Sequence, residues 1–208
     1  MLLLTRSLTQ LASQLGTFTK TSDPRVLYDP VKDRFVFVCF SGSLSTESVI
    51  LVGFSKTNDP AGSWNFYKLN GNSFNDSTWS DYPIIALSGS DLFITFNQVK
   101  DNVSWTVGFK QSVIWQIDKQ RGYDGDTLQY NLWSDIKTGG VNLRNICPAK
   151  QHTLTPANNM YFLSVRNVDL SNDSIFLLEI TDAYASGNAQ LVTKVLQSPV
   201  RYGFPPNA

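Results

Sequence analysis

The stretch Asp91–Asn97 reads DLFITFN, and similar apolar runs occupy Arg34–Phe40 and Asn159–Val165. Turn-forming Asp, Asn or Gly residues lie at the start of each run, which is typical of a tight reversal followed by a β-strand. Within each run, apolar residues occupy consecutive positions and not only alternate ones. A strand of this kind is buried on both faces. The sequence therefore predicts that each run belongs to a sheet packed between neighbouring sheets.

Three further kinds of predicted strand accompany these runs, always in the same order. The first kind follows a proline and precedes the run, at Arg25–Tyr28, Ile84–Leu87 and Ala149–Gln151. The third kind comprises Val49–Ser55, Ser112–Asp118 and Ser174–Ile180. The fourth kind comprises Trp64–Leu69, Leu128–Trp133 and Gln190–Leu196. A unit of four strand segments is therefore repeated three times.

Repeated four-stranded antiparallel units that pack face to face are typical of the blades of a β-propeller. We predict an all-β fold, a partial propeller with blades at approximately 23–70, 81–134 and 145–197. A β-sandwich is the alternative, because twelve strands in two sheets would use similar turns. Residues 198–208 are expected to begin a further blade, and residues 1–22 to form a helix or a strand of a preceding blade. Since propellers have about 4–8 blades, remaining blades or other chains are expected to close the ring.

The composition excludes several classes of site and partner. Lys and Arg together number 17, as do Asp and Glu, so the formal net charge is zero. This balance gives no electrostatic reason to expect a nucleic acid or an anionic membrane as a partner. Two cysteines and one histidine exclude a thiolate zinc site and any site built on several imidazoles. No apolar run approaches the roughly 20 residues that a membrane span needs.

Three segments carry a family likeness: Asp23–Pro30 (DPRVLYDP), Asn58–Trp64 (NDPAGSW) and Trp79–Pro83 (WSDYP). In this order they resemble the secreted or surface β-propellers of Bacteroidetes type, many of them exported by type IX secretion, which are similar to the sialidase-like propeller group. The resemblance covers roughly residues 21–208 and implies a propeller fold and an extracellular or outer-surface location. Those proteins usually carry further blades and a C-terminal sorting domain, and this sequence shows neither.

The innermost strand of each propeller blade lines the central channel, so residues at its start are expected to gather around the axis. These ligand-binding candidates are Asp23, Arg25, Asp81, Tyr82, Arg144 and Asn145. Arginine binds a carboxylate through two parallel hydrogen bonds, and paired carboxylates supply an acid and a base. The alternative interpretation is structural: Asp before Pro caps the turns, and the arginines satisfy carbonyl groups between blades. Exposed aromatic residues offer a second mode of recognition by stacking on sugar rings, at Trp79, Tyr82, Trp105 and Tyr123.

Two other patterns have structural interpretations. Asp59, Gly62 and Trp64 are similar to the Asp-box of sialidase-type propellers, where the aspartate accepts hydrogen bonds from turn amides; we interpret them as a structural turn. Asp118, Asp124 and Asp126 lie in a Gly-rich loop and are weak candidates for Ca²⁺, which prefers oxygen ligands. A solvated hairpin turn is the favoured interpretation of that loop, so no cofactor is expected beyond this calcium candidate.

We expect a non-catalytic extracellular propeller segment that serves as a rigid binding or adhesion scaffold for a glycan or a surface protein. A glycosidase- or sialidase-like hydrolase with an axial active site is one alternative. It is disfavoured because Glu47 and Glu179 are the only glutamates and neither begins an inner strand. A structural subunit of a surface or secretion assembly is the other alternative.

Overall fold

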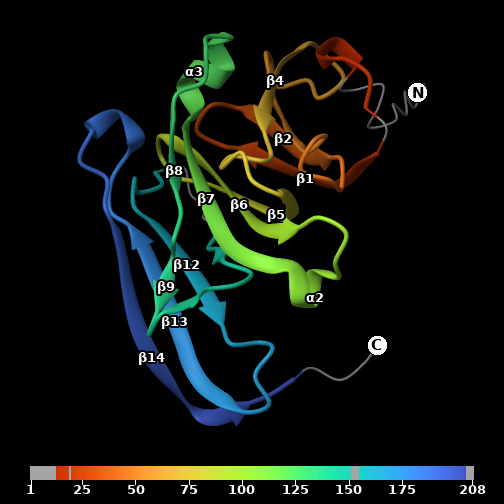
Figure 1. Cartoon of the computed structure of the whole chain (residues 1–208). Coiled ribbons are helices and arrows are strands. Elements are labelled where there is room, and N and C mark those ends of the chain that lie inside the picture. The colour runs from red at the N-terminus through yellow and green to blue at the C-terminus, as the bar shows by residue number, and fades with distance from the viewer. Residues whose placement is uncertain (1–12, 19, 151–154, 205–208) are drawn as a thin grey trace, which may run out of the picture.

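The computed structural model describes residues 13–18, 20–150 and 155–204 (Figure 1). Within these residues, consecutive strands pair as antiparallel neighbours in three four-stranded sheets. The first sheet contains β1 (Thr21–Asp29), β2 (Arg34–Ser41), β3 (Val49–Ser55) and β4 (Trp64–Asn70). The second sheet contains β5 (Thr78–Leu87), β6 (Asp91–Lys100), β7 (Phe109–Asp118) and β8 (Tyr130–Trp133). The third sheet contains β11 (Cys147–Pro148), β12 (Met160–Val165), β13 (Asn172–Ile180) and β14 (Leu191–Tyr202).

Short elements fill the connections between these strands. They are the 3₁₀ turns η1 (Ser13–Leu15) and η2 (Tyr184–Ser186), the helices α2 (Trp105–Gly108) and α3 (Lys119–Asp124), and the hairpin of β9 (Lys137–Thr138) with β10 (Val141–Asn142). None of the helices in the described ranges is long and apolar enough to cross a bilayer.

The prediction of an all-β fold with four-stranded antiparallel sheets is confirmed. The two-sheet sandwich is wrong, because the strands form three separate four-stranded sheets. The expected start of a further blade at residues 198–208 is also wrong for its described part: residues 198–202 belong to β14. Residues 205–208 and 1–12 lie outside the described residues, so the prediction for residues 1–22 meets the structure only at η1 and at the start of β1.

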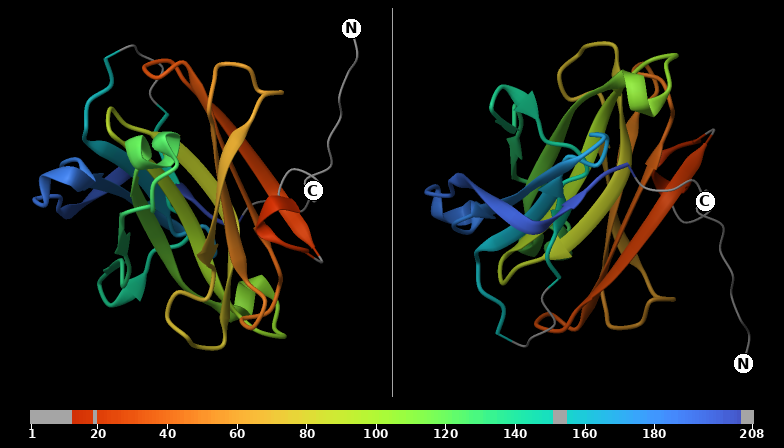
Figure 2. Two further views of the ribbon diagram at one scale, coloured as in Figure 1. Left: turned by 90° about the horizontal axis from the view of Figure 1, so that it is seen from above. Right: turned by 90° about the horizontal axis from the view of Figure 1, so that it is seen from below.

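The three sheets lie as successive layers, coloured red to orange, yellow to green, and cyan to blue in Figure 2. One apolar core lies between the first and second sheets and includes Val38, Phe54 and Ile94. The other face of the second sheet, with Phe93 and Ile114, packs against the third sheet. The second sheet is therefore buried on both faces, as consecutive apolar residues in β6 predict.

The third sheet departs from that prediction. Buried and exposed residues alternate along β12, with Met160, Phe162 and Ser164 buried and Tyr161 and Leu163 exposed. Its buried residues face the second sheet. One face of the third sheet is therefore open, and the expectation that every apolar run is buried on both faces is wrong for Asn159–Val165.

Candidate ligand-binding site

The three sheets approach one another through the first strand of each. Strand β1 contacts β5, and β5 contacts β11. Arg25 ties the first two together, since its Nε donates a 2.8 Å hydrogen bond to the carbonyl oxygen of Pro83. Arg25 does not line the cavity described below, so the structure gives this predicted ligand-binding residue a role in packing between sheets instead.

A residue with left-handed backbone geometry lies in or just before the first strand of each sheet: Asp23 within β1, Tyr82 within β5, and Asn145 shortly before β11. The φ angles are +51° at Asp23, +59° at Tyr82 and +52° at Asn145. The strand registers shift across the first two of these positions, between Ser22 and Arg25 and between Asp81 and Ile84. A bulge of this kind bends the strand and redirects a side chain. Positive φ is uncommon outside glycine and is found at binding sites more often than elsewhere.

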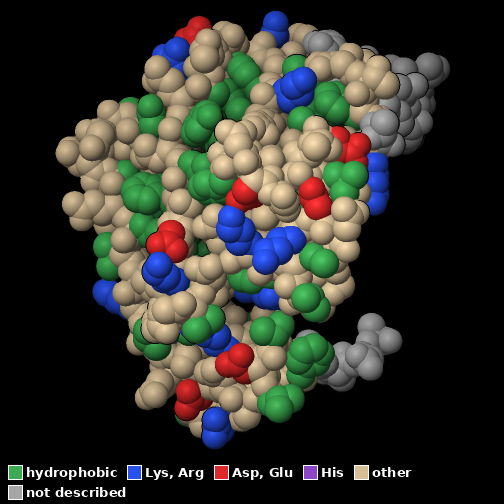
Figure 3. All heavy atoms as spheres, viewed as in Figure 1, with side chains coloured by type: hydrophobic (Ala, Val, Ile, Leu, Met, Phe, Trp, Pro, Cys, Tyr) green, Lys and Arg blue, Asp and Glu red, His purple; other side chains and the backbone are tan. Residues whose placement is uncertain are grey.

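Residues of the bulges in β1 and β5 and of the segment before β11 surround one cavity of about 370 Å³. Its walls include five of the six predicted ligand-binding residues, namely Asp23, Asp81, Tyr82, Arg144 and Asn145. The remaining walls come from the second sheet and from α2: Asn97, Val99, Trp105 and Phe109. Figure 3 shows the face of the molecule seen in Figure 1, on which acidic and basic side chains are interspersed with hydrophobic ones. The structure thus brings these five residues together, with Asp81 and Tyr82 inside β5 and not at its start, and their role in ligand binding stays a prediction.

Asp81 and Asp23 bring two carboxyl groups to this cavity. Burial raises the pKa of the Asp81 carboxyl above its usual value, and the negative charge of Asp23 raises it further. A hydrogen bond from the backbone N–H of Tyr82 to Asp81 Oδ1, 2.9 Å long, acts in the opposite direction. Asp81 therefore holds a proton more readily than an exposed aspartate would.

Arg144 supplies the positive charge of the cavity wall. Its guanidinium lies 4.1 Å from the ring centre of Phe109 and 5.9 Å from that of Trp105. Its Nη2 donates a 3.3 Å hydrogen bond to the carbonyl oxygen of Thr106. Its Nη1 is buried and has no hydrogen-bond partner among the described residues. A buried donor without a partner is costly, and a ligand acceptor in the cavity would satisfy it.

Asn97 holds Asn145 in position. The side chain of Asn97 donates from Nδ2 to Asn145 Oδ1 at 2.5 Å and accepts at Oδ1 from the Asn145 N–H at 3.2 Å. Ser112 Oγ donates to the same Asn97 Oδ1 at 2.7 Å. This paired arrangement fixes the backbone of Asn145 before β11 begins. Asn97 ends the apolar run of β6, and nothing in its sequence pattern distinguishes it from a turn residue.

The four aromatic residues singled out for stacking divide into two pairs. Trp105 and Tyr82 line the cavity and are 54% and 46% exposed. Trp79 and Tyr123 pack instead against the core between the first and second sheets. The sequence identified Trp105 as a loop aromatic, but it gave no signal for Val99 or Phe109, which reach the cavity only through the packing of β6, β7 and α2.

The residues assigned to a structural turn form one. Asp59 Oδ1 accepts a 2.9 Å hydrogen bond from the N–H of Ala61, and the N–H of Gly62 donates 3.0 Å to the carbonyl oxygen of Asp59. Trp64 Nε1 donates 3.1 Å to the carbonyl oxygen of Pro60, and its ring stacks on Phe66. Gly62 does not adopt a positive φ, so its backbone freedom is not what the turn requires.

The acidic Gly-rich segment, for which a solvated hairpin turn was the favoured prediction, forms helix α3. Asp118 caps the helix, with Oδ1 accepting a 3.0 Å hydrogen bond from the N–H of Gln120. Both carboxylate oxygens of Asp124 accept from the side-chain amide of Gln120. Asp126 lies beyond the end of α3. Across the described ranges, no three His, Cys, Asp or Glu residues gather as metal ligands, so the structure does not bring the three calcium candidates together.

A second and larger cavity, about 660 Å³, lies between β8 and η2 and includes Trp133 and Tyr184 in its walls. Asp118 is the one predicted site residue that reaches it, and no inner strand contributes to it. We take the smaller cavity as the candidate site because segments from all three sheets converge there, with two carboxyl groups and an unpaired guanidinium N–H in its walls.

Comparisons with known protein families, with curated proteins and with solved structures found no match to this chain.

Proposed function

We propose that the three sheets are blades of a β-propeller. We further propose that the cavity of about 370 Å³ beside β1, β5 and β11 binds a saccharide but does not catalyse its hydrolysis. The observation that carries the proposal is that Asp23, Tyr82 and Asn145, one from each repeated unit, share a left-handed backbone and line one cavity. Consecutive strand order, face-to-face packing and contacts between β1, β5 and β11 support the propeller arrangement.

The residue types of the cavity favour a saccharide. Trp105 presents an exposed aromatic face on which an apolar sugar face can stack, and Tyr82 adds a second ring. Asp23, Asn145 and Arg144 offer acceptors and donors suited to hydroxyl groups. The volume of about 370 Å³ lies in the usual range of small-molecule pockets, which favours a sugar unit over a flat protein surface.

The proposed setting is extracellular or at the outer cell surface, with a glycan or a glycosylated surface protein as partner. It rests on the likeness of three sequence segments to secreted propellers and on the low content of charged residues, 16% of the chain. In this setting the chain would act as a rigid scaffold, either for adhesion or as a structural subunit of a surface assembly.

Screening the full chain on a glycan array, followed by calorimetry with the best ligand, tests the proposal. Arg144→Gln should weaken binding about 10- to 100-fold, the usual effect of losing a charge-assisted hydrogen bond. Arg201→Gln, on the outer strand β14, is the matched control and should bind as the parent does. Absence of any glycan ligand, or equal losses in both variants, would count against saccharide binding at this cavity.

Glycoside hydrolysis is the second candidate, favoured by one observation. Asp81, whose pKa is raised by burial, lies in the same cavity as Asp23, and a pair of carboxyl groups is what glycoside hydrolysis uses. A panel of chromogenic glycosides and sialosides tests it. If the protein releases the chromophore and Asp81→Asn or Asp23→Asn abolishes that release, the protein is an enzyme and not a binding scaffold.

A further inference from the structure

The outer face of the third sheet is apolar and uncovered. On it lie Tyr161, Leu163 and Val165 of β12, Ile175 and Leu177 of β13, and Leu196 of β14, which we call the open face. The strand register places these residues on one side of the sheet. Leu163 lies opposite Leu177, Val165 lies opposite Ile175, and Ile175 in turn lies opposite Leu196. Leu163 is 50% exposed and Leu196 is 45% exposed.

The equivalent face of the second sheet is covered. Thr95 pairs with Ile114 in β6 and β7 as Leu163 pairs with Leu177 in β12 and β13. Thr95 and Ile114 are 2% and 0% exposed, and Ile114 packs in the core between the second and third sheets. The face of the second sheet that corresponds to the open face is therefore buried by the next four-stranded sheet.

The open face is also more apolar than its covered counterpart. Leu163 occupies the position of Thr95, Val165 that of Asn97, and Ile175 that of Ser112. A sheet face that stays in water normally carries polar residues. At these three positions the uncovered sheet carries aliphatic residues where the covered sheet carries polar ones, which is the reverse of what a solvent-facing sheet needs.

We propose that the open face packs against a further four-stranded antiparallel sheet of the same kind, in the way the third sheet packs on the second. The inference rests on the proposed propeller arrangement, which it extends.

The first sheet of a second copy does not meet this requirement. Phe37, Cys39 and Leu51, on its outer face, are at most 2% exposed, because Leu15 and Phe18 of the same chain pack against them. That end of the stack is already covered, whereas the open face is not. The occupant is therefore an additional sheet that continues the stack beyond the third.

An extended chain tests this directly. A second copy of residues 134–202, with Cys147→Ser in the added copy, is appended to the full chain to supply such a sheet. The original Cys147 is the reporter, since it is exposed and lies opposite Leu163 on the open face. We expect its alkylation by iodoacetamide in native buffer to slow at least tenfold in the extended chain and the melting temperature to rise.

The Leu163→Asp variant shows whether protection of Cys147 comes from packing of the added sheet on the open face or only from its attachment to the chain. In the extended chain we expect it to restore the alkylation of Cys147 and to lower the melting temperature, whereas in the original chain it should change neither. Leu170→Asp is the control, because Leu170 is 92% exposed and precedes β13. Equal Cys147 reactivity in the extended and original chains overturns the proposal.

Analytical ultracentrifugation of the original chain tests whether a second copy of the chain occupies the open face instead. A concentration-dependent dimer in which Cys147 is protected, and which Leu163→Asp dissociates, would show that a second copy covers the open face and would also overturn the proposal. Saccharide binding is measured on the same extended chain. Loss of binding with Cys147 still protected would count against the proposed function alone, so the two failures are distinguishable.

Discussion

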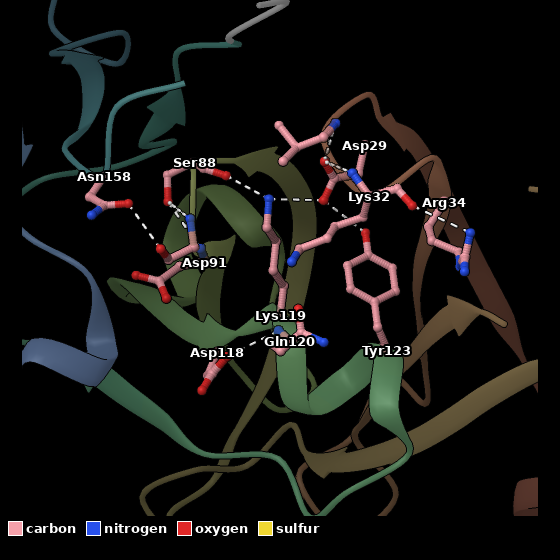
Figure 4. A network of polar contacts seen from close by, with 12 residues as sticks. Asp29, Lys32, Arg34, Ser88, Asp91, Asp118, Lys119, Gln120, Tyr123 and Asn158 are labelled. Carbon is pink, nitrogen blue, oxygen red and sulfur yellow. Dashed lines mark hydrogen bonds and ion pairs between the residues drawn. The ribbon is translucent and has the colours of Figure 1, made fainter. Parts of the chain in front are cut away.

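Lys119 Nζ lies 2.8 Å from Asp29 Oδ2, and both side chains are 1% exposed (Figure 4). The pair joins the start of α3, after the second sheet's β7, to the end of β1 in the first sheet. Lys119 also donates 2.8 Å to the carbonyl oxygen of Ser88, and Asp29 accepts from the hydroxyl of Tyr123 at 3.0 Å. Both buried charges are thus paired and further hydrogen-bonded, which is the condition under which a buried ion pair is tolerated.

Replacing one partner of this pair should destabilise the protein strongly. Lys119→Met leaves the carboxylate of Asp29 buried without its counter-charge, and such losses cost about 3–5 kcal/mol. Urea unfolding followed by tryptophan fluorescence measures the change. The exposed pair Lys137–Asp135 provides the control: its N–O distance is also 2.8 Å, but its side chains are 48% and 69% exposed. Lys137→Met should cost less than about 1 kcal/mol. Similar costs for the two variants would contradict the account.

The stability of the fold should decrease as the pH rises from about 4 to 6. Burial raises the pKa of the Asp91 carboxyl to about 6, although Gln116 and the N–H of Tyr184 donate hydrogen bonds to it. Because the unfolded chain releases this proton near pH 3.9, the folded state binds more protons across the window between the two values. The stability that the protonated group contributes is complete below about pH 4 and is lost as the pH passes 6.

Comparison with Asp91→Asn isolates this effect. The free energy of unfolding of the parent should fall relative to the variant by roughly 2–3 kcal/mol between pH 4 and 7, the size that two pKa units imply. Chemical denaturation at several pH values measures it. A difference between the two proteins that stays constant with pH, or grows in the parent's favour, would rule out a raised pKa at Asp91.

Truncating Trp105 should weaken saccharide binding without affecting the fold. Trp105→Ala removes an exposed ring from the cavity wall, and we expect about a tenfold loss of affinity, the scale of one aromatic contact. Val107→Ala on the same helix is the control, since Val107 is 78% exposed and does not line the cavity. Calorimetry with the array-derived glycan compares the two. A loss in Val107→Ala as large as in Trp105→Ala would assign the effect to α2 as a whole.

The two cysteines should differ in reactivity. Cys39 is fully buried in the first sheet, and burial raises the pKa of its thiol to about 12, so little thiolate forms. Cys147 is exposed, so its thiol is accessible to the reagent. Mass spectrometry after iodoacetamide treatment should show one adduct in native buffer, on Cys147, and two in denaturant. Native labelling of Cys39 would indicate that the first sheet opens readily.

The sequence predicted the strands of the first two units closely, since Val49–Ser55 is a strand with the same limits and Arg34–Phe40 is extended by one residue. It predicted the third unit less well. Cys147–Pro148 is a two-residue strand where Ala149–Gln151 was expected, and residue 151 lies outside the described part. Hydrophobic periodicity shows where a strand runs, but it does not show which face another sheet covers. For that reason Asn159–Val165 looked like a strand buried on both faces.

For the candidate site, the sequence predicted that Asp23 and Asp81 lie where strands begin, but β1 begins at Thr21 and β5 at Thr78, so Pro24 and Pro83 mark a bulge inside each strand and not its start. Only the tertiary structure decided which of these side chains face the cavity. Arg25 is held by the carbonyl of Pro83, whereas Arg144 keeps one N–H unpaired in the cavity wall. The reason is physical: a strand's own pattern is local, but a hydrogen-bond partner is supplied by whichever distant segment packs beside it.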